Sequence, residues 1–220
     1  MPRTQRLLVL YGGQTYLGME VARFARAMEH QVICVVDGPM PSMEHPWMHG
    51  VQWVGAAHLT ESTTSLELSP NALIYCDTTL WDGGQGRFQE ILYDRPLRLA
   101  AAAAAAPQVP RFVFRSSIPH PLLPASYSWW YARAEQALLA LPLDPVILRM
   151  PVLYGPDRPD SALARVAQRL LRPFMGGASN RSLRVDQAAL ATLRAALEPG
   201  PGGIVEPAEI AAAGDVMIPQ

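Results

Sequence analysis

Lysine is missing from this chain: all 18 of its basic residues are arginine. The absence excludes Schiff-base chemistry on a lysine amine and a phosphate-binding loop that ends in lysine. It also excludes any mechanism in which a lysine ammonium lowers the pKa of a neighbouring group. Three common kinds of site are therefore ruled out before any motif is considered.

Cysteines and long apolar runs are also scarce. The two cysteines, Cys34 and Cys76, both fall in expected strands, which indicates buried thiols rather than a disulfide or a metal site. No apolar run approaches the roughly 18 to 20 residues that cross a bilayer, and the first apolar run is too short for a secretory signal. We therefore expect a cytoplasmic protein with no membrane partner.

The charges are nearly balanced, with a formal net charge of −1. No basic stripe is present, so we expect no nucleic-acid partner. Half of the residues are apolar, and the length of 220 residues suits one α/β domain with or without a small appendage. His30, His45, His49 and His58 have no metal-ligand spacing with cysteines or acids, so we expect no metal.

The first 38 residues contain the pattern of a dinucleotide-binding unit. Residues 7–10 form a short apolar run that is typical of a buried parallel strand. From Tyr16, apolar residues recur at steps of three and four up to Met28, which predicts a helix. Residues 31–36 predict a second strand, and Asp37 follows it. An ordinary strand, turn and helix would show much of the same pattern, so that alternative stays open.

Three glycines and an acid define the chemistry expected of this unit. Gly12 would allow the tight turn, Gly13 would let backbone N–H groups approach a pyrophosphate at the helix N-terminus, and Gly18 would let the helix lie close to the strand. Asp37 is placed to accept hydrogen bonds from an adenosine ribose and to repel a 2′-phosphate, so NAD is favoured over NADP. The cofactor contacts expected here are Gly12, Gly13, Thr15, Tyr16, Leu17, Gly18 and Asp37.

Strands and helices continue to alternate after this unit. We expect strands at 51–54, 72–76, 111–115 and 145–150, and helices at 88–106 and 128–141. This alternation predicts a doubly wound, mostly parallel sheet of the Rossmann type. Ligands bind such sheets beyond the carboxyl ends of the strands. The residues expected at those ends are Gly12, Gly13, Asp37, Asp77, Thr78, Ser116 and Ser117.

Several segments together resemble the NAD-dependent epimerase/dehydratase family, the extended and atypical short-chain dehydrogenases. They are LYGGQTYLG, VQWVGA, ALIYC, RFVFRSS, SWWYARAEQALLA and VILRMPVLYGPD, and the resemblance covers nearly the whole chain. It implies an NAD(P)-binding Rossmann domain over residues 1–150 and a small C-terminal substrate lobe over residues 151–220, which would include a last strand at 203–206 and a terminal helix. It also implies a small-molecule substrate, and it leaves open a homodimer through the helices that flank the fourth and fifth strands.

The chain departs from this family at two points. Thr15 stands where typical members carry a glycine; its Cβ would reduce backbone freedom near the phosphates, and its hydroxyl could contact one of them. The family's usual acid is a tyrosine four residues before a lysine, and aligning SWWYARAEQALLA puts Trp129 and Arg133 at these positions. Trp129 cannot donate a phenolic proton, whereas Arg133 could still hydrogen-bond a ribose of the cofactor and supply positive charge. Tyr127 could reach the site if it precedes the first helical turn.

The catalytic residues expected from the resemblance are Ser116, Ser117, Tyr127 and Arg133. Each serine could hold a substrate carbonyl or hydroxyl, as the family's serine does, or could only complete the hydrogen bonds of its strand. His120 could exchange protons, although a role as an ordinary surface residue is favoured. The glycine-rich loop at 81–87 could act as a lid or could only connect two elements.

Two classes of function follow from these observations. In the first, the chain is an NAD(P)-dependent oxidoreductase or epimerase that acts on a small molecule by a mechanism without the tyrosine–lysine pair. In the second, it binds a dinucleotide without turnover, as a sensor or scaffold. Loss of the pair favours the second class, and the small and polar residues kept at the strand ends favour the first. The sequence favours the enzyme narrowly and also leaves a flavin-linked reductase open.

Overall fold

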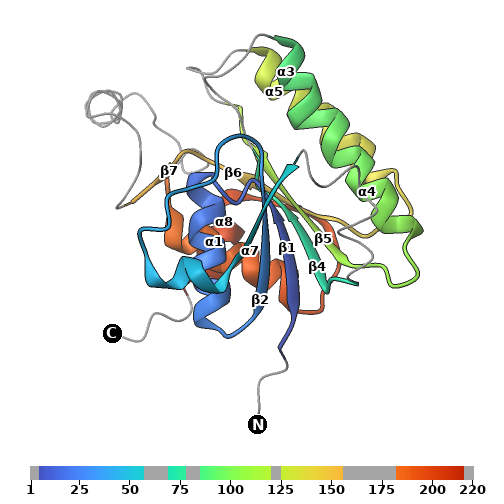
Figure 1. Ribbon diagram of the computed structural model, residues 1–220. Helices are drawn as coiled ribbons and strands as arrows, with labels where there is room; N and C mark the ends of the chain where they lie inside the picture. Colours follow the sequence, from blue (N-terminus) through green and yellow to red (C-terminus); the bar gives the residue numbers. More distant parts are fainter. Residues whose placement is uncertain (1–4, 57–68, 78–84, 120–124, 156–181, 216–220) are drawn as a thin grey trace.

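Figure 1 shows the computed structural model, which describes residues 5–56, 69–77, 85–119, 125–155 and 182–215. Strands and helices alternate along these segments, and most of the strands form one large sheet with helices on both of its faces. None of the described helices is long and apolar enough to cross a membrane. The predicted Rossmann-type α/β fold is confirmed.

The large sheet has seven strands, all parallel, in the order β3-β2-β1-β4-β5-β6-β9. Val9 of β1 pairs with Ile33 of β2 on one side and with Leu73 of β4 on the other. The strand order reverses between β1 and β4, and sheets of this kind bind ligands beyond the carboxyl ends of the strands at that reversal. The strands are β1 (Leu7–Tyr11), β2 (Gln31–Val36), β3 (Gln52–Gly55), β4 (Ala72–Tyr75), β5 (Arg111–Ser117), β6 (Val146–Met150) and β9 (Gly203–Val205).

Two helical layers cover the sheet (Figure 1). Helices α1, α7 and α8 pack together on one face, and α3, η3, α4 and α5 form the other layer. Their bounds are α1 (Tyr16–Ala27), α3 (Gln85–Gln89), η3 (Glu90–Asp94), α4 (Arg95–Ala105), α5 (Ala125–Leu139), α7 (Val185–Leu197) and α8 (Pro207–Asp215). The smaller elements are a 3₁₀-helix, η1 (Pro46–Gly50), and a two-stranded sheet of β7 (Leu153–Tyr154) and β8 (Leu183–Arg184).

Each face of the large sheet contributes to a separate apolar core. In β1, Leu8 and Leu10 face the layer of α1 and α7, whereas Val9 and Tyr11 face the layer of α4 and α5. This alternation is the two-residue period of a strand. Because both faces are buried, β1 is a continuous apolar run. The buried alanines of α4 are small enough to let that helix lie close to the sheet.

The predicted helix over residues 88–106 is not one regular helix. The helical segment begins at Gln85 and ends at Ala105, and its middle, η3, is a π-helical turn. There the backbone N–H of Arg95 donates to the carbonyl of Glu90, five residues back. Pro96 follows and has no N–H, so the regular ladder of hydrogen bonds is broken at this point.

The C-terminal part of the chain joins the large sheet. β9 pairs with β6, with Ile204 opposite Ile147, and α7 packs against α1 and β5. The expected last strand and terminal helix are therefore confirmed. Residues 156–181 lie outside the described residues, so the division into a domain at 1–150 and a lobe at 151–220 stays a prediction.

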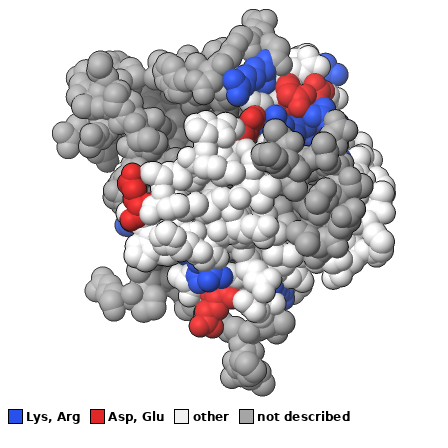
Figure 2. Space-filling model, in the orientation of Figure 1, with Lys and Arg blue, Asp and Glu red and all other residues white. Residues whose placement is uncertain are grey.

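Charged side chains lie in small mixed groups on the face of the molecule in Figure 2, where Arg stands beside Asp or Glu. Ion pairs at the surface of the described residues include Arg98 with Glu90 and Arg184 with Asp186. Pairs of this kind contribute about 0–1 kcal/mol each. We therefore attribute the stability of the fold mainly to the two apolar cores.

Candidate functional site

The turn between β1 and α1 lies at the carboxyl edge of the sheet, where the strand order reverses. Gly12 has a φ of +80°, in the left-handed region that favours glycine. A Cβ on Gly12 would lie 2.5 Å from the backbone nitrogen of Asp77, and one on Gly13 would lie 2.6 Å from the Cβ of Cys34. The turn is therefore closely packed between the ends of β2 and β4, and a side chain fits at neither Gly12 nor Gly13.

Backbone hydrogen bonds fasten this turn to β2. The N–H groups of Gly12 and Gly13 both donate to the carbonyl of Val35, at 3.0 and 3.3 Å. Gly13 therefore makes room for β2, and its own N–H is used within the fold. Gly18 brings α1 against the turn, because a Cβ there would overlap the carbonyl oxygen of Gly12. The N–H groups in the first turn of α1 have no backbone acceptor within the helix.

Thr15 is the N-cap of α1. Its hydroxyl accepts a hydrogen bond from the N–H of Gly18 at 3.1 Å and donates one to the carbonyl of Gly12 at 2.7 Å. Its φ of −72° and ψ of 159° are an extended conformation that threonine adopts without strain. The expected reduction of backbone freedom therefore has no consequence here. The capped N-terminus keeps the partial positive charge that attracts anions.

Tyr16 and Leu17 begin α1, and their side chains have structural contacts. Leu17 is buried in the core beneath the helix. A Cβ on Gly155 would lie 2.7 Å from the hydroxyl oxygen of Tyr16, which brings the chain just after β7 beside the start of α1. Any contact of Leu17 with an anion would therefore be made by its backbone N–H.

An arginine bridges two acids at the ends of β2 and β4. Nη1 of Arg95 donates to the carboxylates of Asp37 and Asp77, at 3.0 Å in each case. Burial lowers the pKa of Arg95, but Tyr75 and the hydrogen bond to Asp37 raise it by more, so the guanidinium stays charged. Two carboxylates that share one guanidinium give this group of three side chains a net negative charge.

Gln14 brings a polar atom without a partner to the same edge. Its Nε2 donates to the backbone carbonyl of Asp37 at 3.3 Å. Its Oε1 is buried and has no hydrogen-bond partner among the described residues. A buried amide oxygen is destabilising when no donor reaches it. The position beside Asp37 therefore suits a ligand that brings a hydroxyl or an N–H.

The two serines at the end of β5 have different surroundings. Ser116 is fully buried, and its hydroxyl donates to Glu135 at 2.5 Å. Glu135 also receives Arg149 of β6 at 2.6 Å, so Ser116 belongs to a structural network. Ser117 is half-buried, and its hydroxyl donates to the carbonyl of Ile118 at 3.2 Å. Of the two, Ser117 is the one placed to meet a ligand.

A pair of tyrosines occupies the inward face of α5. Tyr127 and Tyr131 are four residues apart, each is 1% exposed, and their hydroxyl oxygens are 3.4 Å from each other. Nη1 of Arg115, on β5, donates to Tyr131 at 2.9 Å and lies 3.5 Å from the hydroxyl oxygen of Tyr127. The residues that share the four-residue spacing and face the sheet are therefore Tyr127 and Tyr131. The aligned positions, Trp129 and Arg133, are therefore not the ones that face the sheet.

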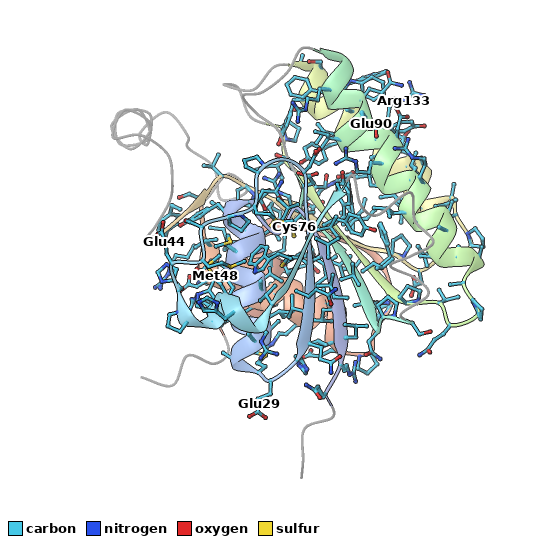
Figure 3. All side chains as sticks on the ribbon, viewed as in Figure 1. Glu29, Glu44, Met48, Cys76, Glu90 and Arg133 are labelled. Atoms are coloured by element: carbon cyan, nitrogen blue, oxygen red, sulfur yellow. The ribbon has the colours of Figure 1, made fainter. Side chains whose placement is uncertain are left out.

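Trp129 and Arg133 lie on another face of α5. Trp129 is 49% exposed, and the exposed Arg133 has its guanidinium carbon 4.8 Å from the centre of the Trp129 ring and 5.2 Å from that of Tyr93. Figure 3 shows Arg133 on the outer side of the helical layer, away from Cys76 in the sheet. The structure therefore does not bring Arg133 together with Tyr127 and Ser117, because Ala125 begins the helix earlier than the sequence indicated.

Burial controls the ionisation of the groups near this edge. It lowers the pKa of Arg115, but Tyr131 and Tyr127 raise it by more, so that the net shift is upward and the charge is kept. Burial raises the pKa of Cys76 to about 12; Arg115 lowers it and Asp77 raises it. The edge therefore holds a permanent cation beside the tyrosine pair and a neutral thiol beside that cation.

Four residues at this edge were not among the expected site residues: Gln14, Arg95, Arg115 and Tyr131. Arg115 could have been singled out from the sequence, because it lies next to the end of an apolar strand and a buried arginine almost always has a partner. Tyr131 follows Tyr127 by one helical repeat, so the pair could have been found from spacing alone. Arg95 and Gln14 had no such signal, because their contacts join segments far apart in the sequence.

Some expected features lie outside the described residues, among them His58, Thr78, His120 and residues 81–84 of the glycine-rich loop. Residues 85–87 of that loop begin α3. Within the part of the chain that the structure describes, no group of three or more His, Cys, Asp or Glu side chains could hold a metal ion.

Comparisons with known proteins define the class of fold. No protein-family model matches the chain, and no curated protein matches it either. Many solved structures do match, among them enzymes in complex with NAD and an epimerase. The resemblance found in the sequence is therefore confirmed at the level of the fold.

Three of these solved structures illustrate the match. The enzyme WbmH from Bordetella bronchiseptica, in complex with NAD+, has a TM-score of 0.70 and 20% identity, with 92% of this chain and 75% of that chain covered. WbmG from the same organism, in complex with NAD and UDP, has a TM-score of 0.70 and 14% identity, with 92% and 73% covered. The UDP-N-acetylglucosamine 4-epimerase from Bacillus cereus has a TM-score of 0.66 and 17% identity, with 94% and 83% covered.

Proposed function

We propose that this chain binds NAD at the turn between β1 and α1 and oxidises, reduces or epimerises a hydroxyl-bearing small molecule beside Ser117 and Tyr127. The observation that carries the proposal is the edge formed by the capped N-terminus of α1, Asp37 and the buried Oε1 of Gln14, which has no partner among the described residues. A dinucleotide would supply an anion for the helix and ribose hydroxyls for the two side-chain acceptors.

The charge at this edge favours NAD over NADP. The pyrophosphate would lie against the first turn of α1, and a ribose would donate to Asp37 and to Oε1 of Gln14. Asp37 and Asp77 share Arg95, so two carboxylates and one guanidinium would face a 2′-phosphate and repel it. NADP would have to displace Arg95 from both acids to gain a favourable contact.

Ser117 and Tyr127 are the residues that would act on the substrate. Bound NAD supplies a hydride acceptor or donor. The hydroxyl of Ser117 would hold the oxygen of the substrate, and Tyr127 would take up or return the proton of that oxygen. Ser116 and Arg133 keep structural roles in this scheme, because the first is committed to Glu135 and the second packs on exposed aromatic rings.

A second function, dinucleotide binding without turnover, is favoured by the burial of Tyr127. With a side chain that is 1% exposed, this hydroxyl meets a substrate only after nearby segments rearrange. A sensor or scaffold needs no such access. The two functions make the same prediction for NAD binding and opposite predictions for turnover.

Calorimetric titration with NAD+, NADH, NADP+ and NADPH tests the proposal. We expect NAD(H) to bind more tightly than NADP(H), and Asp37→Asn to weaken NAD binding by about 10- to 100-fold, the equivalent of a lost hydrogen bond to a charged group. Glu44→Gln is the matched control, because it removes a negative charge from an exposed loop residue (Figure 3) whose carboxylate contacts Ser42. Absence of binding by all four nucleotides would overturn the proposal.

Turnover is measured separately on protein that binds NAD+. UDP-N-acetylglucosamine and UDP-glucose are suitable first probes, since one of the similar structures is an epimerase named for such a substrate. Formation of NADH or of an epimerised sugar supports the enzyme. Tight NAD binding with no turnover on a broad panel of secondary alcohols and ketones supports the sensor or scaffold instead.

A further inference from the structure

The tyrosine pair on α5 has a cation beside it even though the chain has no lysine. Tyr127 and Tyr131 stand one helical repeat apart, and the cation is the guanidinium of Arg115, which comes from β5 rather than from the same helix. In the family that the sequence resembles, the cation next to the catalytic tyrosine is the lysine one repeat further along the helix. The sequence alignment puts that position at Arg133, which lies on another face of α5 and packs against Trp129 and Tyr93.

The surroundings of Arg115 are unusual for a buried arginine. Its polar contacts among the described residues are the two tyrosine hydroxyls, and no carboxylate of those residues lies within ion-pair distance of it. A buried charge is strongly destabilising unless an opposite charge or several hydrogen bonds compensate it. Phenol hydroxyls compensate it weakly, whereas a phenolate would compensate it fully.

Other charged groups near the pair are already committed to partners. Glu135, one repeat beyond Tyr131, is held by Arg149 and Ser116. Asp77 is held by Arg95, which also lies 3.8 Å from Glu90. The hydroxyl of Tyr75, on the neighbouring strand, donates to the carbonyl of Ile91. Arg115 interacts with both tyrosines and with Cys76, and Tyr75 interacts with Tyr131 and also with Asp77, Glu90 and Arg95.

We propose that Arg115 takes over the electrostatic role of the missing lysine: its guanidinium favours the phenolate form of the Tyr127–Tyr131 pair. Arg115 is a positioning residue in this scheme, because it acts through the tyrosines. An arginine suits this task because it stays charged under conditions in which a buried lysine would lose its proton. Tyr131 accepts a hydrogen bond from Arg115 at 2.9 Å, and its hydroxyl oxygen lies 3.4 Å from that of Tyr127, so the guanidinium acts on both phenols.

The inference rests on the proposed function for its chemical meaning. In the oxidation of a secondary alcohol, the C–H hydrogen leaves with its electron pair as a hydride to NAD+, the carbon–oxygen bond becomes a carbonyl, and the hydroxyl proton passes to the Tyr127 phenolate. NAD+ is reduced to NADH, and the tyrosine pair gains one proton. Arg115 contributes by increasing the fraction of the pair that is present as phenolate and therefore able to accept this proton.

Spectroscopic titration of tyrosine tests the inference without a substrate. The ultraviolet absorbance of phenolate is followed against pH in the full chain and in Arg115→Met, Arg115→Lys, Tyr127→Phe and Tyr131→Phe. The Tyr127→Phe and Tyr131→Phe variants identify the ionisation of the pair as the one that each of them changes. It should move upward by about 1–3 pH units in Arg115→Met, which is the effect of removing an opposite charge at this distance. Arg115→Lys should restore most of the shift.

Two controls keep the result decisive. Circular dichroism confirms that each variant is folded, and Arg115→Gln replaces Arg115→Met if the latter does not fold, because it keeps a donor and removes the charge. If the ionisation of the tyrosine pair is the same in the folded neutral variants as in the original chain, the inference is wrong. Calorimetry with NAD+ on the same samples distinguishes failure of the proposed function from failure of this inference. A chain that does not bind NAD+ can still show the effect of Arg115 on tyrosine ionisation.

Discussion

The glycine turn before α1 and the inward face of α5 both follow the carboxyl end of a strand, but they depart from the expected pattern in different ways. At the turn the one unusual residue, Thr15, caps the helix and leaves the geometry intact. On α5 the tyrosine pair has no lysine beside it, and the cation that contacts it is Arg115 of β5. The comparison teaches that a backbone-built site tolerates substitution of a side chain, whereas a site built from side chains must recruit a replacement.

We expect the largest effect from Tyr127→Phe, which changes the inward face of α5 and is measured as a loss of kcat. Removal of a group that transfers a proton lowers kcat by about 10²–10⁴-fold, whereas NAD binding should change little. Trp129→Phe is the matched control, because this exposed aromatic residue is two positions away on the same helix and lies on another face of it. Equal turnover in Tyr127→Phe and the original chain would remove Tyr127 from the reaction.

The difference between these two regions also shows what the sequence could predict. The strands and helix around Gly12 and Gly18 follow from local periodicity and glycine spacing, and the structure has them within one or two residues. The face of α5 depends on where the helix begins and on which aromatic residues meet the sheet. The sequence aligns Trp129 with the family's tyrosine, yet the buried positions belong to Tyr127 and Tyr131.

Contacts between segments that are far apart in the sequence could not be predicted, for a related reason. Arg115 reaches the tyrosines of α5, and Arg95 reaches Asp37 and Asp77, only because the sheet brings three strand ends together. Neither contact leaves a periodic trace in the chain. Sequence patterns indicate which residues are buried, but the partner of a buried charge is decided by the packed structure.

The thiol of Cys76, which lies between the two regions, should react slowly in the folded protein. Burial raises its pKa from an ordinary 9.0 to about 12, so at a mildly alkaline pH the thiolate fraction falls by about a thousand-fold, since three pH units separate the two values. Alkylation by iodoacetamide, followed by mass spectrometry in a Cys34→Ser background, measures this. Urea-unfolded protein is the control and should react at the ordinary rate.

The same shift has a consequence for stability, with a defined sign. The folded state keeps the Cys76 thiol protonated up to about pH 12, while the unfolded chain ionises near 9.0. The unfolded state therefore binds fewer protons between these values, and the free energy of unfolding falls as pH rises through this window. A Cys76→Ser variant should lose that part of the pH dependence. Rapid alkylation of the native protein, or a pH dependence unchanged in the variant, would contradict the assignment.

Glu135→Ala tests the network behind the tyrosine pair. The carboxylate is nearly buried and holds Ser116 and Arg149, so its loss leaves both without their partner. Breaking a buried pair in this way costs about 3–5 kcal/mol, and we expect about 2–4 kcal/mol because Arg149 keeps Glu206 and is partly exposed. Urea unfolding measures the change. Glu206→Ala, on the exposed side of the same arginine, should cost less than about 1 kcal/mol.

We expect the smallest effect from Thr15→Ala, which tests the role of the Thr15 side chain in the glycine turn. The variant loses the hydrogen bonds from the Gly18 N–H and to the Gly12 carbonyl, and loss of an N-cap costs about 1 kcal/mol. Ser42→Ala is the control, because that exposed hydroxyl contacts Glu44 in a loop and should change stability by less than about 0.5 kcal/mol. NAD binding should persist in Thr15→Ala, since the expected anion donors are backbone groups of α1. A loss of binding larger than the loss of stability would mean that the Thr15 hydroxyl contacts the phosphates itself, and the turn would then depend on a side chain as α5 does.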